Sequence, residues 1–171
     1  MTALAAWVLA AMTGLQPDAR WKSSYPATAE AIAKVSVEAP LYDGPQREAR
    51  TAALFVAVAY YESRFRNEAR GGRGRYLCLM QVARENLAPG GAAHVVQSPE
   101  ACLRAALPTM QRSFKRCGRR PETEWLGLFA ASTCEKGADA SKGRVYLARL
   151  LLRRHADTLP PDSKLDATTR L

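Results

Sequence analysis

The sequence predicts a mostly α-helical protein, all-α or α+β at most with a minor β element, organised around one buried central helix. Residues 51–61 are almost all apolar and leave no polar face, which is typical of a helix buried on all sides. Shorter segments with apolar residues at helical spacing lie on both sides of this run. No stretch of any length alternates polar and apolar residues as a β-strand does, so we expect at most a small β element near 70–80.

The size and composition are those of a single soluble globular domain. The chain has 171 residues, of which 47% are hydrophobic and 24% are charged, enough to build a real core. Lysine and arginine exceed aspartate and glutamate by 25 to 16, for a net charge of +9. This balance predicts an anionic partner: nucleic acid, a membrane surface or the bacterial wall. Because the basic residues are spread from Arg20 to Arg170, charge alone does not choose among them.

The chain divides into three parts by pattern. Residues 1–45 are expected to form N-terminal helices packed on the domain, residues 46–156 the main core, and residues 157–171 a loose tail with little apolar material. The first apolar run is about a dozen residues long, whereas a membrane span needs roughly 20. No positive charge precedes it, which favours a packed helix over an atypical export signal.

Capping residues and apolar spacing set the other expected elements. The expected helices and turns are a helix within Trp21–Pro40, a turn at Leu41–Pro45, the core helix from about Gln46, a Gly/Arg loop at 70–75, a helix over Glu100–Arg116 capped by Ser98, a short helix over Trp125–Ala131, and a last helix over Ser141–His155.

Four cysteines predict disulfides rather than a metal site. No two of them are spaced as zinc ligands, and the two histidines offer no such spacing either. On one straight helix Cys102 and Cys117 would lie about 22 Å apart, too far to pair unless the helix breaks near Pro108. This favours the pairs Cys78–Cys102 and Cys117–Cys134. Disulfides in turn predict a working compartment outside the reducing cytoplasm.

Glu62 is the first charged residue after the buried run. A lone glutamate is most often a surface residue. A carboxyl group held against apolar walls is harder to ionise, however, and can keep a proton to donate near neutral pH. That is the property of a general acid.

The residues around Glu62 resemble a known family. Glu62-Ser63-Arg64-Phe65 reads E-S-x-F, and after the Gly/Arg loop the chain continues with Leu-Met-Gln-Val at 79–82. This is similar to the lysozyme-like lytic transglycosylases, the soluble-type (SLT) domain of the goose-type lysozyme superfamily, whose signature is E-S-x-F followed by G-L-M-Q-[IV]. The resemblance covers roughly residues 46–155. It implies a lysozyme-like helical domain that cleaves peptidoglycan between N-acetylmuramic acid and N-acetylglucosamine.

The resemblance also implies roles for individual residues. Glu62 would be the only catalytic carboxylate, acting first as acid and then as base to close a 1,6-anhydro ring. Gln81 and the backbone of Leu79 and Met80 would line the sugar cleft, with Ser63 near the muramoyl peptide. Tyr61 could offer a stacking face, although aromatic rings on such a helix more often pack in the core.

Two departures from the family pattern stand out. Cys78 occupies the position where the family has glycine, so a disulfide there could take over the task of holding the loop. In a later family motif, Y-[AN]-[SA]-G, the tyrosine hydroxyl contacts the catalytic glutamate. The matching residues here run from Phe129 to Ser132. Phe129 has no hydroxyl. Either a neighbouring tyrosine, Ser132 or Thr133 replaces it, or burial alone tunes the acid.

We therefore expect an enzyme that degrades peptidoglycan glycan strands without metal or cofactor, and without a nucleic-acid partner or a stable membrane span. It would act in the periplasm or cell wall, reached by an unknown route such as a phage virion or a secretion apparatus. One alternative is a hydrolytic muramidase, in which a second carboxylate holds a water. A binding module that kept the fold without the chemistry is another, and the net charge and the 70–75 loop suggest a nucleic-acid binder as a third. The carboxylates that could hold the water are Glu68, Glu85, Glu135 and Asp139.

Overall fold

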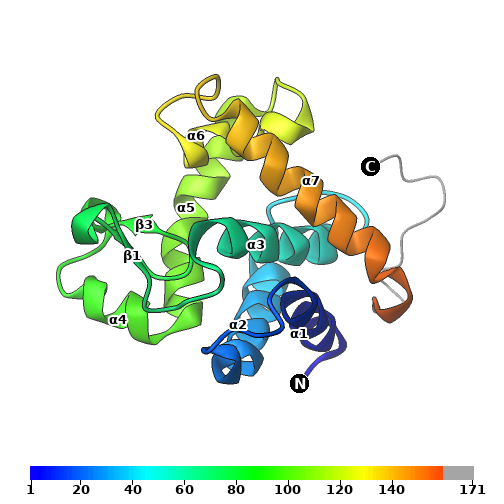
Figure 1. The fold of residues 1–171 in the computed structure, drawn as a ribbon. Helices are drawn as coiled ribbons and strands as arrows, with labels where there is room; N and C mark the ends of the chain where they lie inside the picture. Colours follow the sequence, from blue (N-terminus) through cyan, green and yellow to red (C-terminus); the bar gives the residue numbers. More distant parts are fainter. Residues whose placement is uncertain (160–171) are drawn as a thin grey trace.

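The computed structural model describes residues 1–159 and shows a mostly helical molecule with one small three-stranded sheet (Figure 1). The predicted fold class is therefore confirmed. The α-helices and strands are α1 (Ala3–Leu15), α2 (Tyr25–Glu38), α3 (Arg47–Ser63), β1 (Arg70–Gly71), β2 (Tyr76–Leu77), β3 (Val82–Ala83), α4 (Gly91–Gln97), α5 (Pro99–Cys117), α6 (Gly127–Ala130) and α7 (Ala138–Arg154). Short 3-10 turns η1 to η5 lie at Lys22–Ser24, Gly72–Gly74, Arg84–Asn86, Glu122–Glu124 and Ala156–Thr158.

Helix α3 is the centre of the fold, as Figure 1 shows. Every residue from Ala52 to Ala59 is 0% exposed. Helices α1, α2 and α7 all pack against it, and its small alanine side chains allow such close approach on several faces. The apolar run is thus surrounded by other helices over residues 51–59, while Tyr61 is exposed, and Glu62 lies in the last turn of α3.

Helix α3 ends abruptly because two residues adopt left-handed backbone conformations. Arg64 has φ 55° and Phe65 has φ 67°, a conformation that costs a non-glycine residue about 1–3 kcal/mol. The Phe65 ring is fully buried and meets the rings of Tyr25 and Tyr60 at centroid distances of 5.5 and 5.8 Å. Burial of this ring offsets the backbone cost, and the helix stops directly after Ser63.

The first two helices belong to the core. Helix α1 begins with a capping bond in which the Ala5 N–H donates to Thr2 Oγ1 at 3.2 Å. It buries Trp7, Val8 and Met12, and it packs against α2 and α3. Within residues 1–159, no helix is both long and apolar enough to cross a membrane.

The Gly/Arg loop is part of the small antiparallel sheet, in the order β1-β2-β3. Gly71 pairs with Tyr76, and a Cβ on Gly71 would lie 2.2 Å from Oε1 of Gln81. Gly72 has φ +53°, and a Cβ there would come within 2.9 Å of the Tyr76 ring. Gly72 therefore suits both its positive φ and the nearby Tyr76 ring, whereas the atom nearest to Gly71 is the end of the flexible Gln81 side chain.

The remaining helices follow the expected order with shifted ends. Helix α5 starts at Pro99 with Ser98 as its cap, as predicted, and it contains Pro108 without breaking. Helix α7 begins at Ala138 and not at Ser141. Helix α4 was not predicted, because its glycine- and alanine-rich sequence carries little apolar periodicity.

The chain end described by the structure is packed, which corrects one expectation. The tail was expected to be loose from Asp157, but residues 156–158 form a 3-10 turn and Leu159 is only 3% exposed within the core. A single leucine after a polar stretch gives no periodic signal, so its burial in the core could not be read from local pattern. The rest of the predicted tail, 160–171, lies outside the described residues.

Candidate active site

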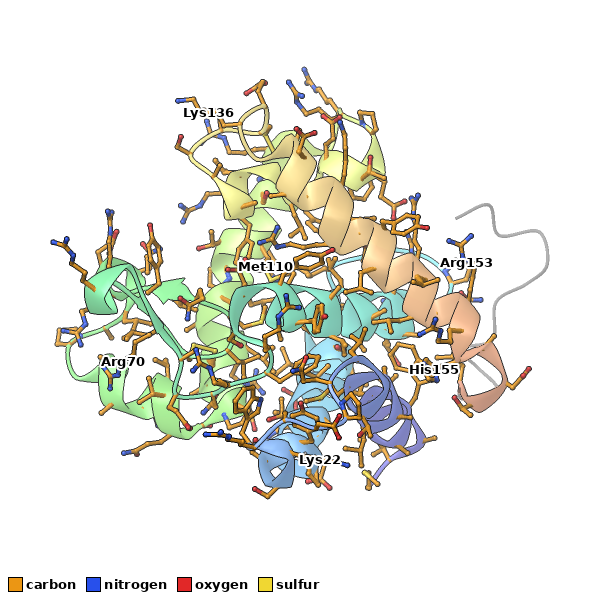
Figure 2. The ribbon with its side chains drawn as sticks, viewed as in Figure 1. Lys22, Arg70, Met110, Lys136, Arg153 and His155 are labelled. Atoms are coloured by element: carbon orange, nitrogen blue, oxygen red, sulfur yellow. A yellow bond between two sulfur atoms is a disulfide. The ribbon has the colours of Figure 1, made fainter. Side chains whose placement is uncertain are left out.

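A cleft with a volume of about 600 Å³ lies beside the end of α3. The sheet and its turns form one wall, and α5, α6 and α7 contribute the others. Figure 2 labels Arg70 on β1, Met110 on α5 and Lys136 on the loop before α7. The residues that line it include Glu62, Tyr76, Met80, Gln81, Glu85, Thr109, Phe129, Ser132 and Arg144.

Glu62 lies in this cleft as one half of an ion pair. Arg144 Nη2, from α7, donates to Glu62 Oε1 at 2.6 Å. The side chains are 20% exposed for Glu62 and 12% for Arg144. The carboxylate is therefore largely sheltered from water, yet it opens onto a space large enough for a ligand.

The surroundings of Glu62 differ from the expected apolar walls. The guanidinium group of Arg144 donates directly to the Glu62 carboxyl group. Among the described residues, Arg144 is the hydrogen-bond partner of Glu62, and neither Ser132 nor Thr133 takes the place of the missing tyrosine hydroxyl. No motif pointed to Arg144, since it lies 82 residues from Glu62 in sequence.

The loop that joins β2 to β3 presents two predicted residues to the cleft. Met80 and Gln81 both line it, and the Gln81 amide donates to the Cys78 carbonyl at 3.0 Å. Leu79 is fully buried, and its carbonyl lies 2.9 Å from the Ser63 hydroxyl. The loop is thus tied directly to the end of the helix that carries Glu62.

Three of the predicted site residues lie outside the cleft lining: Ser63, Tyr61 and the fully buried Leu79. Ser63 is buried, with its hydroxyl also 3.1 Å from the Ala59 carbonyl, so it holds the helix end and is not placed to meet a peptide. Tyr61 is 48% exposed, and its ring centroid lies 5.4 Å from the Arg144 guanidinium carbon. Tyr61 therefore covers Arg144 from outside the cleft.

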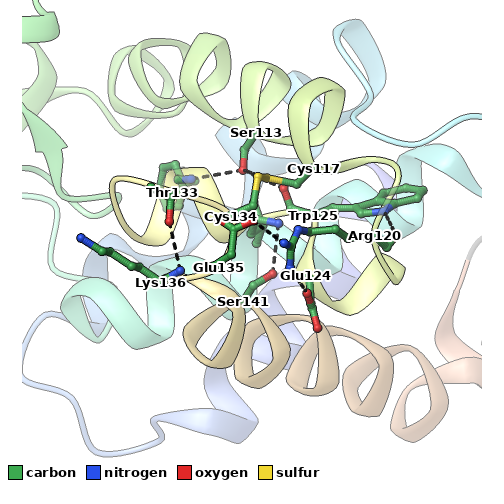
Figure 3. The surroundings of a disulfide bond; sticks show 12 residues. Ser113, Cys117, Arg120, Glu124, Trp125, Thr133, Cys134, Glu135, Lys136 and Ser141 are labelled. Carbon is green, nitrogen blue, oxygen red and sulfur yellow. Dashed lines mark hydrogen bonds and ion pairs between the residues drawn. A yellow bond between two sulfur atoms is a disulfide. The ribbon is translucent and has the colours of Figure 1, made fainter.

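The two predicted disulfides are present. Cys78 pairs with Cys102, and Cys117 pairs with Cys134, with Cα–Cα distances of 6.0 and 5.8 Å. The first bridge joins the Met80–Gln81 loop to α5, where Cys102 Sγ also accepts from the Met80 N–H at 3.3 Å. The second joins the end of α5 to the loop after α6 (Figure 3). Each bridge therefore holds one wall of the cleft.

Phe129 and Ser132 reach the cleft from α6 and the loop that follows it. The backbone at the start of α6 is held by Ser113 of α5, whose buried hydroxyl donates to the Trp125 carbonyl at 2.7 Å and accepts from the Phe129 N–H at 3.1 Å. On its other side α6 packs closely against the loop before α7, since a Cβ on Gly137 would lie 1.9 Å from the Gly127 carbonyl oxygen. The α6 wall thus contacts both α5 and the loop that leads into α7.

One further carboxylate lines the cleft. Glu85, in η3, lies in the lining and pairs with Arg75 at 2.8 Å. The Arg75 guanidinium holds the pKa of the Glu85 carboxyl below its ordinary value. The other three carboxylates that the sequence brought into consideration, Glu68, Glu135 and Asp139, do not line the cleft.

Metal ligation and thiol chemistry have little basis at this site. Within residues 1–159, no group of three or more histidine, cysteine or acidic side chains is arranged to hold a metal ion. All four cysteines are oxidised in pairs. The acidic and phenolic side chains that the described residues place in the cleft lining are those of Glu62, Glu85 and Tyr76.

Comparisons with models of known protein families, with curated proteins and with solved structures found no match to this chain. The resemblance to the lytic transglycosylases therefore rests on the short motifs at 62–65 and 79–82. Those motifs, 17 residues apart between their first residues in sequence, meet at one cleft.

Proposed function

We propose that the protein is a peptidoglycan lytic transglycosylase in which Glu62 is the acid and the base. The observation that carries the proposal is the meeting of Glu62 with Met80 and Gln81 at one cleft of about 600 Å³. A sheltered carboxyl beside a ligand-sized space is the arrangement that general acid catalysis requires. The basic chain suits the anionic peptides of the wall.

In this proposal Glu62 transfers its proton to the glycosidic oxygen as the bond from that oxygen to C1 of the muramoyl sugar breaks. The resulting carboxylate then accepts the proton of the muramoyl 6-hydroxyl. The 6-oxygen bonds to C1 and closes a 1,6-anhydro ring. Glu62 ends in its protonated form, and no water is consumed.

The experiment is digestion of isolated sacculi, with soluble products identified by mass spectrometry. We expect the wild-type protein to release muropeptides that end in 1,6-anhydromuramic acid. Glu62→Gln should fold normally and lose at least about 100-fold in rate, because a positioned acid contributes about 10²–10⁴-fold. Glu68→Gln is the matched control, since Glu68 is exposed and does not line the cleft. Undiminished cleavage by Glu62→Gln would refute the proposal.

A hydrolytic muramidase is the second candidate, favoured by the position of Glu85 in the same cleft. A hydrolase commonly needs a second carboxylate, which either activates the attacking water as a base or attacks the sugar itself as a nucleophile. Its products would be heavier by one water than the anhydro products. Its rate would also fall in Glu85→Gln, whereas a transglycosylase should tolerate that change. A protein that binds sacculi but releases nothing would be a binding module.

The site of action in this proposal is the wall, outside the cytoplasm. Two disulfides are compatible with an oxidising compartment. A phage virion or a secretion apparatus remains a proposed means of delivery.

A further inference from the structure

The ion pair between Glu62 and Arg144 has no part in the proposed reaction as written. In that reaction Glu62 gives its proton to the glycosidic oxygen, yet Arg144 Nη2 already donates to one of its two carboxyl oxygens, Oε1, at 2.6 Å. A largely buried arginine placed on the reacting group therefore calls for a function of its own.

Three contacts hold the Arg144 side chain in place. Nη1 donates to the Ala140 carbonyl one turn back in α7 at 2.7 Å, and Nη2 donates to Glu62. The Tyr61 ring covers the guanidinium at 5.4 Å. With 12% of its side chain exposed, Arg144 is a fixed donor, unlike a mobile surface cation.

The pair engages only one oxygen of the carboxyl group. Among the described residues, the hydrogen bond to Glu62 goes to Oε1. The other titratable groups that line the cleft are Tyr76 on β2 and Glu85 in η3, while α5 and α6 bring none. Arg144 is thus the only cationic side chain that the described residues place in the cleft lining.

We propose that Arg144 is the positioning residue for Glu62: it holds Oε1 and leaves Oε2 as the oxygen that exchanges the proton. This inference rests on the proposed function. Arg144 would do here what a tyrosine hydroxyl does in the family that the motifs resemble, because Phe129 supplies no hydroxyl. A misplacement of the acid by about 1 Å can cost about 100-fold in rate.

The first test uses Arg144→Ala in the sacculus assay, with Arg144→Lys and Arg144→Gln beside it. We expect Arg144→Ala to lower kcat about 100-fold with KM almost unchanged. Added guanidinium chloride at millimolar concentration should restore part of the rate by occupying the vacated space, and Arg144→Lys should retain more activity than Arg144→Gln.

The matched control is Arg149→Ala, on the same helix. Arg149 is 24% exposed and pairs with Glu122 at 3.6 Å, away from the cleft. It should keep kcat and show no guanidinium rescue.

Loss of kcat in Arg144→Ala that guanidinium does not restore would overturn the inference. If Arg144→Ala does not fold, the activities of the other two variants decide. Higher activity in Arg144→Lys than in Arg144→Gln supports the inference, and equal activity overturns it.

The second test does not depend on activity. A water-soluble carbodiimide with an amine labels accessible carboxyls, and peptide mass spectrometry reports labelling at each one. Labelling of Glu62, relative to the fully exposed Asp139, should rise several-fold in Arg144→Gln, because the carboxyl group is no longer held in one orientation beneath a largely buried guanidinium and becomes more accessible to the reagent. Equal labelling would overturn the inference whether or not sacculi are cleaved. If labelling increases but the wild-type protein cleaves no sacculi, the positioning of Glu62 by Arg144 stands. The proposed function is then rejected.

Discussion

Cys78 adopts a backbone conformation that glycine accepts at little cost. Its φ is 61°, and a residue with a Cβ is destabilised there by about 1–2 kcal/mol. Glycine is what the related motif has at this position, so the geometry of the loop suits the motif even though the residue differs. The bridge to Cys102 holds the loop that carries Met80 and Gln81. The disulfide therefore supports a conformation that Cys78 by itself disfavours.

We predict that, once the bridge is removed, glycine is the better residue at position 78. In a Cys102→Ala background, Cys78→Gly should be more stable than Cys78→Ala by about 1 kcal/mol, because only glycine adopts positive φ without a steric cost. Urea unfolding of the two double variants measures the difference. If the alanine variant is equally stable, the loop does not keep its left-handed conformation without the disulfide.

At the scale of the elements, one hydroxyl joins α5 to α6. Ser113 is 0% exposed and bonds two backbone groups, the Trp125 carbonyl and the Phe129 N–H (Figure 3). Helix α6 has only four residues, too few to be stable on its own. Its position, and that of Phe129 in the cleft, depends on this contact and on the Cys117–Cys134 bridge.

We predict that Ser113→Ala lowers the free energy of unfolding by about 2–4 kcal/mol, because the partly buried Phe129 N–H and Trp125 carbonyl both lose this partner. Ser36→Ala is the matched control: Ser36 is also 0% exposed, but its hydroxyl has no hydrogen-bond partner among the described residues. It should change stability by less than about 1 kcal/mol. Chemical denaturation of both variants checks this, and equal losses would contradict it.

At the scale of the whole molecule, residues from both ends of the described chain close the core around α3. Trp7 of α1 donates through Nε1 to the His155 carbonyl at 3.1 Å, and the two rings meet edge to face at 6.4 Å. Burial lowers the pKa of His155 below its ordinary value of 6.5, and Arg154 lowers it further. The native state thus holds this imidazole neutral where the unfolded chain would protonate it.

This difference sets the sign of a pH effect on stability. Because the pKa is lower in the folded protein, the unfolded chain binds more protons as pH falls through 6.5, and folding becomes less favourable. We predict that the wild type loses stability on acidification through this range and that His155→Gln loses less. Thermal unfolding from neutral pH down to about pH 5 tests this. Parallel curves for the two proteins would show that His155 does not contribute.

Much of the fold was predictable from local patterns. The apolar run at 51–61 could only be a buried helix, and the Ser98 cap with Pro99 placed the start of α5 correctly. Spacing along one helix also favoured the disulfide pattern that the structure has. Helix α4 and the packing of Leu159 were missed, because neither has a periodic apolar pattern of its own.

For the candidate site, the motifs brought Glu62, Gln81 and Phe129 into consideration, and the structure places all three at one cleft. The partner of Glu62 could not be found in this way. Glu62 and Arg144 are 82 residues apart in sequence and meet only because the surfaces of α3 and α7 pack together. No local pattern shows which arginine of α7 faces α3.

The sequence by itself determined the central helix and placed the Glu62 carboxyl group directly after its buried run, because a continuous apolar stretch is a local pattern. Only the tertiary structure decided that this carboxyl faces a guanidinium, that Ser63 points into the core and that Glu85 shares the cleft. These contacts depend on distances between residues far apart in the chain, which packing of the whole molecule sets.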